Sequence, residues 1–235
     1  MAKKILIKNT VIFDGVNSAL LKNADILLEE NTIKKIGENI SADGITKIID
    51  GSKFTVIPGL IDCHVHFRSW MSPLFFKFGV TTIRDVGNDP DWIIPLREKE
   101  KSGDNSLPRI VCYGSLLDGV PAFWKSGSIE LSSSEDVRKA TSYLAEKGVD
   151  GFKTYFGLSK ELFGKIVEIA RKANIPVASH LWWKVSAWDA AEVGISSIEH
   201  ADGIFFPIPK DRIQLFIDLL MNKNIYIDPT LVVNE

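Results

Sequence analysis

The spacing of apolar and polar positions divides the chain into two parts. Residues 1–56 consist of short β-type runs separated by turn residues, and they show no helical periodicity. The runs cover residues 4–13, 24–37 and 45–57, the second with a turn at Glu30. This pattern predicts a small β domain over residues 1–56.

From residue 57 onward, short apolar runs alternate with amphipathic stretches, a pattern typical of parallel βα units. The predicted strands cover residues 56–67, 81–86, 109–115, 151–156, 175–180, 196–200 and 225–233. The predicted helices cover residues 132–148, 159–174, 186–194 and 209–224. The first helix begins with a serine cap and Glu135, and several helices end at Gly or Asn.

Seven strands with intervening helices favour a (β/α)8 TIM barrel over residues 57–235, with a small β-sandwich-like sheet before it. A doubly wound open sheet is the rival fold, but it normally carries a Gly-rich phosphate loop after its first strand, which this sequence lacks. A closed barrel needs eight strands, and the sequence ends just after the seventh. We therefore expect either a fragment or a barrel that another chain completes.

An unclosed barrel exposes the edges of its first and last strands, which invites pairing with other chains. We expect a homo-oligomer or a complementing C-terminal segment on this ground.

The amino-acid composition limits the classes of partner that we expect. The chain has 45% hydrophobic residues, 25% charged residues and a formal charge of -2, without a basic tract. These values predict a soluble globular protein and give no reason to expect nucleic acid or a membrane as partner, so a small-molecule substrate fits better. The N-terminus lacks the apolar core of a signal peptide, and we expect a cytoplasmic protein. Cys63 and Cys112 have no CxxC spacing and are interpreted as buried, reduced thiols.

The four histidines of the chain all fall at the ends of predicted strands. His64 and His66 end the first strand, His180 the fifth and His200 the sixth. In a (β/α) barrel these ends open onto the face that carries the active site. His64 and His66 are two residues apart, so both rings project to one side of the strand, as two ligands of one metal require. A lone HxH pair is a weak signal, because hydrogen-bonded interior histidines are common, but its recurrence at two further strand ends favours a metal site.

Lys153 lies inside the apolar run of residues 151–156, where its ammonium group would be buried. A buried, unpaired ammonium is costly, so such a lysine is usually neutralised, paired or modified. One interpretation is a lysine that extends to the strand end. The other is a carbamate on Lys153, which would bridge two metals about 3.5 to 4 Å apart.

The motifs PGLIDCHVHF, GVTTIRDVG, GFKTY and IEHADG, with Ser179 and His180, resemble the metal motifs of the amidohydrolase superfamily, specifically its imidazolonepropionase-like and prolidase-like branch. The resemblance implies that His64 and His66 bind the more buried metal and that His180 and His200 bind the second. It also implies a carboxylated Lys153 that bridges the two metals. We expect Lys153, His180 and His200 to act in catalysis through this centre.

One part of the family pattern is missing. The general base of the family is an aspartate at the end of strand eight, beyond the end of this sequence. Asp228 and Asp202 are the nearest carboxylates, yet neither matches the family position. Asp85 is interpreted as a structural partner.

Two further residues are candidates for substrate binding. Arg68 and Tyr155 each follow a predicted metal ligand by two residues, so each should point the same way. A guanidinium at this position would bind a substrate carboxylate, although a solvated loop arginine is equally compatible with the pattern. Aromatic residues after strands three, five and six either line an apolar rim or pack between helices; they are Trp124, Trp182, Trp183, Phe205 and Phe206.

The sequence therefore predicts a metal-dependent amidohydrolase that cleaves a C–N bond with a metal-bound hydroxide. Its substrate would be a dipeptide, an N-acyl amino acid or a cyclic amide. Zinc is the expected metal because imidazole suits it, with manganese, cobalt or iron as alternatives. The competing hypothesis is a truncated, catalytically silent metal-binding barrel or one half of a split enzyme.

Overall fold

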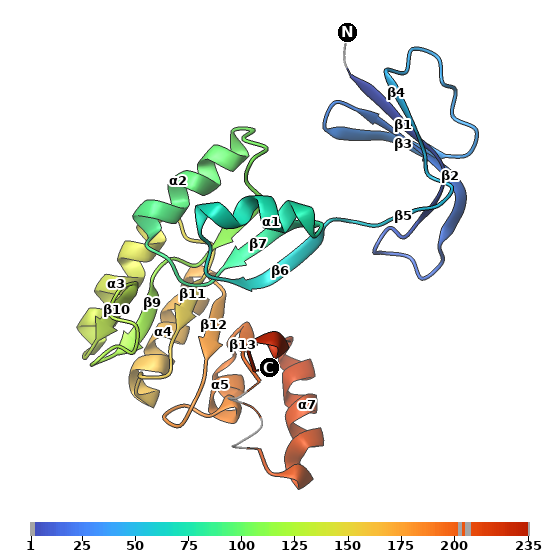
Figure 1. The fold of residues 1–235 in the computed structure, drawn as a ribbon. Helices are drawn as coiled ribbons and strands as arrows, with labels where there is room; N and C mark the ends of the chain where they lie inside the picture. Colours follow the sequence, from blue (N-terminus) through green and yellow to red (C-terminus); the bar gives the residue numbers. More distant parts are fainter. Residues whose placement is uncertain (1–2, 202–203, 205–207, 235) are drawn as a thin grey trace. The chain divides into compact units, whose positions relative to one another are not determined.

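The chain forms two compact units, Met1–Gly59 and Leu60–Glu235, in the computed structural model (Figure 1). The structure describes residues 3–201, 204 and 208–234. The first unit has one sheet and the second has two groups of hydrogen-bonded strands, and each unit has its own apolar packing.

The first unit is a five-stranded mixed sheet. Its strands are β1 (Lys4–Ile12), β2 (Leu21–Glu29), β3 (Thr32–Gly37), β4 (Lys47–Asp50) and β5 (Thr55–Val56). The order is β3-β2-β1-β4, and β5 pairs in parallel with β1. Glu30 adopts a positive φ of 52° at the predicted turn between β2 and β3. The β character predicted for this part of the chain is confirmed.

The second unit alternates strands and helices. Its strands are β6 (Leu60–Val65), β7 (Val80–Asp85), β8 (Arg109–Cys112), β9 (Leu116–Gly119), β10 (Ser128–Leu131), β11 (Phe152–Thr154), β12 (Val177–His180), β13 (Ser197–Glu199) and β14 (Tyr226–Asp228). Its α-helices are α1 (Ser72–Lys77), α2 (Pro90–Lys101), α3 (Ser134–Lys147), α4 (Lys160–Ala173), α5 (Ala187–Val193) and α7 (Ile213–Lys223). Short 3-10 helices cover Ser69–Met71, Lys210–Arg212 and Leu231–Asn234.

The strands of this unit pair in parallel along a curved path. One group has the order β6-β7-β8, and the other has the order β10-β9-β11-β12-β13-β14. In Figure 1 they follow one another along a curved surface with α2, α3 and α4 beside it. Because all strands are parallel, their carboxyl ends lie at one edge, which is where the predicted site residues fall. The predicted α/β class is confirmed.

The third predicted strand, residues 109–115, is two strands. Gly114 adopts a φ of 69° and interrupts the strand, and the chain then continues as β9. The first segment, β8, pairs with β7, while β9 pairs with β11 and β10. One apolar run thus connects the two groups of strands, and the pattern of the sequence did not predict the division or β10.

The predicted helix ends are present. Ser133 caps α3 by accepting a hydrogen bond from the backbone N–H of Asp136, and Gly148 ends that helix in the left-handed region. Asn174 ends α4 in the same way. Ser186 and Asp189 form a capping box at the start of α5.

One large apolar cluster packs the helices against the strands. The inward face of α4 contributes residues spaced three and four apart: Leu162, Phe163, Ile166, Val167 and Ala170. Leu144 of α3 and Phe152 of β11 belong to the same cluster. This packing positions the strand ends that carry the site.

Among the described residues, no helix is both long enough and apolar enough to cross a bilayer. The predicted pairing of the outer strands with another chain stays a prediction.

Replacing Leu144 with Ala should lower the free energy of unfolding by about 2 to 5 kcal/mol, because its side chain is fully buried in the cluster. Leu215→Ala on α7 is the matched control, since Leu215 is 57% exposed. The control should change stability by less than about 1 kcal/mol. Urea unfolding measures both values, and similar losses in the two variants would contradict the packing described.

Candidate metal centre

The parallel strands bring the four histidines together. His64 lies in β6, His66 follows that strand, His180 is the last residue of β12, and His200 directly follows β13. The ring centroids are 5.7 Å apart for His64 and His66, 4.5 Å for His64 and His200, and 4.1 Å for His180 and His200. Residues up to 136 positions apart in sequence therefore form one continuous imidazole cluster.

Three of the rings are held through Nδ1. His64 Nδ1 lies 2.7 Å from Glu199 Oε2, and His66 Nδ1 lies 3.2 Å from the carbonyl oxygen of Gly87. His200 Nδ1 lies 2.7 Å from Thr230 Oγ1. A carboxylate or a carbonyl accepts the Nδ1 proton and directs Nε2 elsewhere, which is the usual arrangement of histidines that bind metals.

Several nitrogens of the cluster are buried without a partner. Among the described residues, His64 Nε2, both ring nitrogens of His180 and Lys153 Nζ have no hydrogen-bond partner. Buried polar groups in folded proteins are nearly always paired, so each unpaired group requires an explanation. Three of the five predicted ligands are thus buried with unpaired nitrogens.

Burial also lowers the pKa values of His180 and His200. Desolvation, assisted by the neighbouring His200 and Lys153, lowers the pKa of His180 to about 2. Desolvation and His64 lower the pKa of His200 to about 3. Both imidazoles are therefore neutral near neutral pH, and the neutral form is the one that binds metal ions.

Lys153 lies in the middle of β11, and its side chain is completely enclosed. Burial lowers the pKa of its amine to about 7, although Glu199 partly opposes that change. A large fraction of the amine is therefore unprotonated near neutral pH, and an unprotonated amine is the reactive form.

Arg84 and Glu199 form a buried ion pair that the sequence analysis did not predict. Arg84 Nη2 lies 2.7 Å from Glu199 Oε1 and 2.8 Å from Oε2. Ser197 Oγ donates to Glu199 Oε1 at 2.5 Å. Burial alone would raise the pKa of Glu199. The His64 hydrogen bond and the charges of Lys153 and Arg84 outweigh this effect and lower the pKa to about 2. Glu199 is therefore ionised and accepts the Nδ1 proton of His64.

Asp228, at the end of β14, belongs to the same edge. The candidate ligand atoms of His64, Glu199 and Asp228 all lie within 4.8 Å of one another, and Asp228 Oδ2 is 3.7 Å from Arg84 Nη2. Because the oxygens of Glu199 are already occupied by Arg84, Ser197 and His64, we interpret Glu199 as a residue that orients His64.

Asp85 holds the loop that follows β6. Its Oδ2 accepts hydrogen bonds from the backbone N–H of Phe67 at 2.7 Å and from Asn88 Nδ2 at 2.5 Å. Desolvation raises the pKa of this carboxyl to about 6 despite these donors. Asp85 thus acts as the structural partner that the sequence analysis expected.

The two predicted substrate residues differ in their surroundings. Arg68 is exposed, but its Nη1 donates to Asn88 Oδ1 at 2.6 Å and to the carbonyl oxygen of Phe67. The Tyr155 ring lies 4.6 Å from the His180 ring, and the Tyr155 hydroxyl accepts a hydrogen bond from Trp124. Tyr155 therefore contacts the cluster directly.

The two cysteines differ in exposure. Cys112 is buried as expected, but the prediction for Cys63 is wrong, because that thiol is exposed. It alternates with His64 along β6 and so points to the opposite side of the strand. Asp202, Phe205 and Phe206 lie outside the described residues.

Comparisons with known proteins agree with this architecture, although no protein-family model matches the chain. Among solved structures, the chain is similar to a Xaa-Pro dipeptidase with bound methionine in the active site, with a TM-score of 0.76 and 22% identity over 98% of this chain and 67% of that one. It is also similar to the bottromycin amidohydrolase, with a TM-score of 0.72 and 22% identity over 97% of this chain and 52% of that one. At these identities the similarity establishes the fold alone.

Curated enzymes share sequence with parts of the chain. A dihydroorotase from Clostridioides difficile (strain 630) is 48% identical over 64 residues, which cover 27% of this chain and 15% of the relative. An adenine deaminase from Clostridium perfringens (strain 13 / Type A) is 28% identical over 200 residues, 77% of this chain and 33% of the relative. The chain thus spans a third or less of the length of these relatives. Together the similarities confirm the predicted resemblance to the amidohydrolase superfamily.

Replacing Glu199 with Gln should lower the free energy of unfolding by about 3 to 5 kcal/mol, because Arg84 loses its buried countercharge. The matched control is Glu135→Gln, which removes the partner of Arg138 in an exposed ion pair and should cost at most about 1 kcal/mol. Denaturant unfolding at neutral pH measures both. Equal losses in the two variants would show that the buried ion pair contributes no more to the free energy of unfolding than the exposed one.

Asp85 should make stability depend on pH. Its pKa is raised from 3.8 to about 6 in the folded protein, so its favourable contribution is complete below pH 3.8 and is lost as pH rises through 6. Relative to Asp85→Asn, the wild-type protein should therefore lose about 2 kcal/mol between pH 4 and pH 7. Urea unfolding of both proteins across this range provides the test, and a difference that does not vary with pH would contradict it.

Proposed function

We propose that the second unit is a (β/α)8 barrel of the amidohydrolase type and that its centre binds two divalent metals. The ligands would be His64, His66, Lys153, His180 and His200. The observation that carries the proposal is the set of buried, unpaired nitrogens on His64, His180 and Lys153, together with the close approach of the histidine rings.

The donor set fits such metals. Imidazole nitrogens suit zinc, with manganese, cobalt or iron as alternatives. His64 Nδ1 contacts a carboxylate and His66 Nδ1 contacts a carbonyl oxygen, and these acceptors hold both rings in the tautomer whose Nε2 lone pair can bind a metal. His200 Nδ1 contacts the hydroxyl of Thr230. His180 has both ring nitrogens available.

Lys153 would contribute a carbamate. Its amine reacts as the neutral form with carbon dioxide, forming an N–C bond and releasing one proton. The pKa of about 7 makes that form abundant near neutral pH, and burial excludes competing water. The negative carbamate would replace an unpaired amine in the centre and would bridge the two metals.

The reaction would be hydrolysis of a C–N bond. Two bound metals supply Lewis-acid activation of water and of the scissile carbonyl. Glu199 keeps His64 oriented through its Nδ1 hydrogen bond, while Arg84 keeps Glu199 ionised. The roles proposed for Arg68 and Tyr155 are binding of a substrate carboxylate and contact with the group beside the scissile bond.

The substrate class would be a dipeptide, an N-acyl amino acid or a cyclic amide. Two similarities support this range, since the dipeptidase resembles the whole fold and the dihydroorotase matches 64 residues at 48% identity.

Lys153 and the metal content provide the test. Protein supplied with bicarbonate and zinc should bind about two metals per chain and gain the mass of one carbon dioxide. Lys153→Ala should lose the added mass and most of the second metal. Lys160→Ala is the matched control because Lys160 is exposed, and it should lose neither.

Plasma mass spectrometry of the metals and intact-protein mass spectrometry measure these quantities. An unmodified Lys153 in metal-loaded protein would contradict the carbamate. Full metal occupancy without metal-dependent hydrolysis of dipeptide, N-acyl amino acid or cyclic amide substrates would contradict the proposed activity and favour a silent metal-binding barrel.

A further inference from the structure

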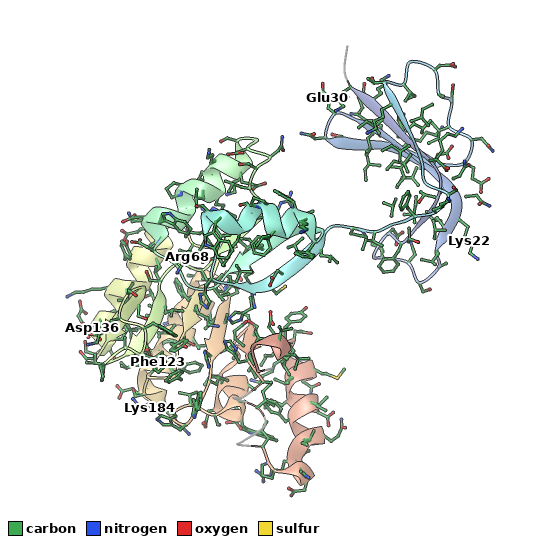
Figure 2. All side chains as sticks on the ribbon, in the orientation of Figure 1. Lys22, Glu30, Arg68, Phe123, Asp136 and Lys184 are labelled. Carbon is green, nitrogen blue, oxygen red and sulfur yellow. The ribbon has the colours of Figure 1, made fainter. Side chains whose placement is uncertain are left out.

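Six aromatic side chains gather beside His180. They come from the loops that follow three parallel strands: Phe123 and Trp124 after β9, Tyr155 and Phe156 after β11, and Trp182 and Trp183 after β12. Figure 2 labels Phe123 and also Lys184, which follows this group in the loop after β12. We call these six residues the aromatic wall.

Phe156 connects the members of the wall. Its ring centroid lies 5.1 Å from Phe123, 5.5 Å from Trp182 and 5.4 Å from Trp183. It also lies 5.4 Å from the ring of His180. The wall is therefore continuous with the candidate metal centre.

Much of this surface faces solvent. Phe123, Trp124, Trp182 and Trp183 are each about half or more exposed, with Trp183 at 66%. Exposed aromatic rings that form one contiguous group are unusual on a soluble protein and commonly mark a binding site. Packing between helices, the alternative considered from the sequence, would have buried them.

The loops that carry the wall are held in place by polar contacts. Asp118, which is fully buried, accepts hydrogen bonds from the backbone N–H of Phe123 at 2.9 Å and of Gly157 at 2.8 Å. Lys184 Nζ donates to the carbonyl oxygen of Gly157 at 2.6 Å, which ties in the third loop. One carboxylate and one ammonium group thus connect all three loops and preorganise the rings.

Preorganisation matters because a ligand then does not have to order the loops when it binds. Aromatic rings prefer offset or edge contacts with other aromatic rings, and such pairs are stronger than their buried area alone predicts. A wall of this kind discriminates a flat aromatic group from an aliphatic group of similar size.

We propose that the aromatic wall, which adjoins His180, is the subsite for an aromatic ring of the substrate. The occupant is an amide, such as an N-acyl amino acid or a dipeptide, whose acyl group or side chain carries that ring. This inference rests on the proposed function, because the scissile bond would lie at the histidine cluster.

The test compares two probes that differ only in ring type, 3-phenylpropionate and 3-cyclohexylpropionate, neither of which has an amide to hydrolyse. Isothermal titration of the full chain, with and without zinc, measures their affinities. The phenyl probe should bind about tenfold more tightly than the cyclohexyl probe.

Trp183→Ala and Phe156→Leu should each reduce this preference by at least about fivefold. Trp70→Ala is the matched control, because Trp70 is 67% exposed and borders a different group that includes Met71 and Leu74. It should leave both affinities unchanged. Thermal unfolding of each variant verifies that it is folded.

Equal affinity for the two probes would overturn the inference, as would a loss in Trp70→Ala equal to that in Trp183→Ala. It would also be overturned if Trp183→Ala dissociated an oligomer in sedimentation without changing probe affinity, since the wall would then be an interface between chains.

The two proposals fail separately. Selective phenyl binding in a protein that hydrolyses no amide contradicts only the proposed activity. Unselective binding in an active protein contradicts only the aromatic subsite.

Discussion

The Arg84–Glu199 ion pair is the interaction on which the candidate centre depends. Arg84 extends from β7, and Glu199 lies on β13, so the pair connects strands that are not neighbours in either group. Glu199 also holds Nδ1 of His64 on β6. Burying two charges is costly unless each is fully hydrogen-bonded, and here the guanidinium, an imidazole and the Ser197 hydroxyl all contact one carboxylate. These hydrogen bonds offset the desolvation of the two charges. The same contacts hold β7 and β13 together and orient His64, a candidate metal ligand.

Burial has a second effect at the centre. Desolvation lowers the pKa of His180, His200 and Lys153, so these groups are neutral at a pH where exposed lysine would be charged. Neutral nitrogens are donors for metals, while charged ones repel them. The same lack of solvent that would destabilise an empty cluster therefore prepares it to bind cations.

Several features could be predicted from local pattern. The serine cap of α3, the left-handed Asn174 after α4 and the turn at Glu30 depend on neighbouring residues alone, and all were found where expected. The division of residues 109–115 into two strands was not predicted, because a glycine in an apolar run does not show that the residues after it pair with a different strand, here β11. Cys63 was placed wrongly because alternation along a strand shows that two sides differ, not which side is covered.

The positions of the four histidines near strand ends and of Lys153 within a strand were set by the sequence, since hydrophobic runs and their boundaries are local properties. Their approach to one another, the charge on Glu199 and the lowered pKa of Lys153 were decided by the tertiary structure. Arg84 and Glu199 were visible as charges inside apolar runs, yet their partnership spans 115 positions and has no local signal. The aromatic wall likewise has no local signal in the sequence, because three loops become one surface only when parallel pairing places β9, β11 and β12 side by side. Pairing between distant segments depends on the geometry of the whole sheet, which no short stretch of sequence encodes.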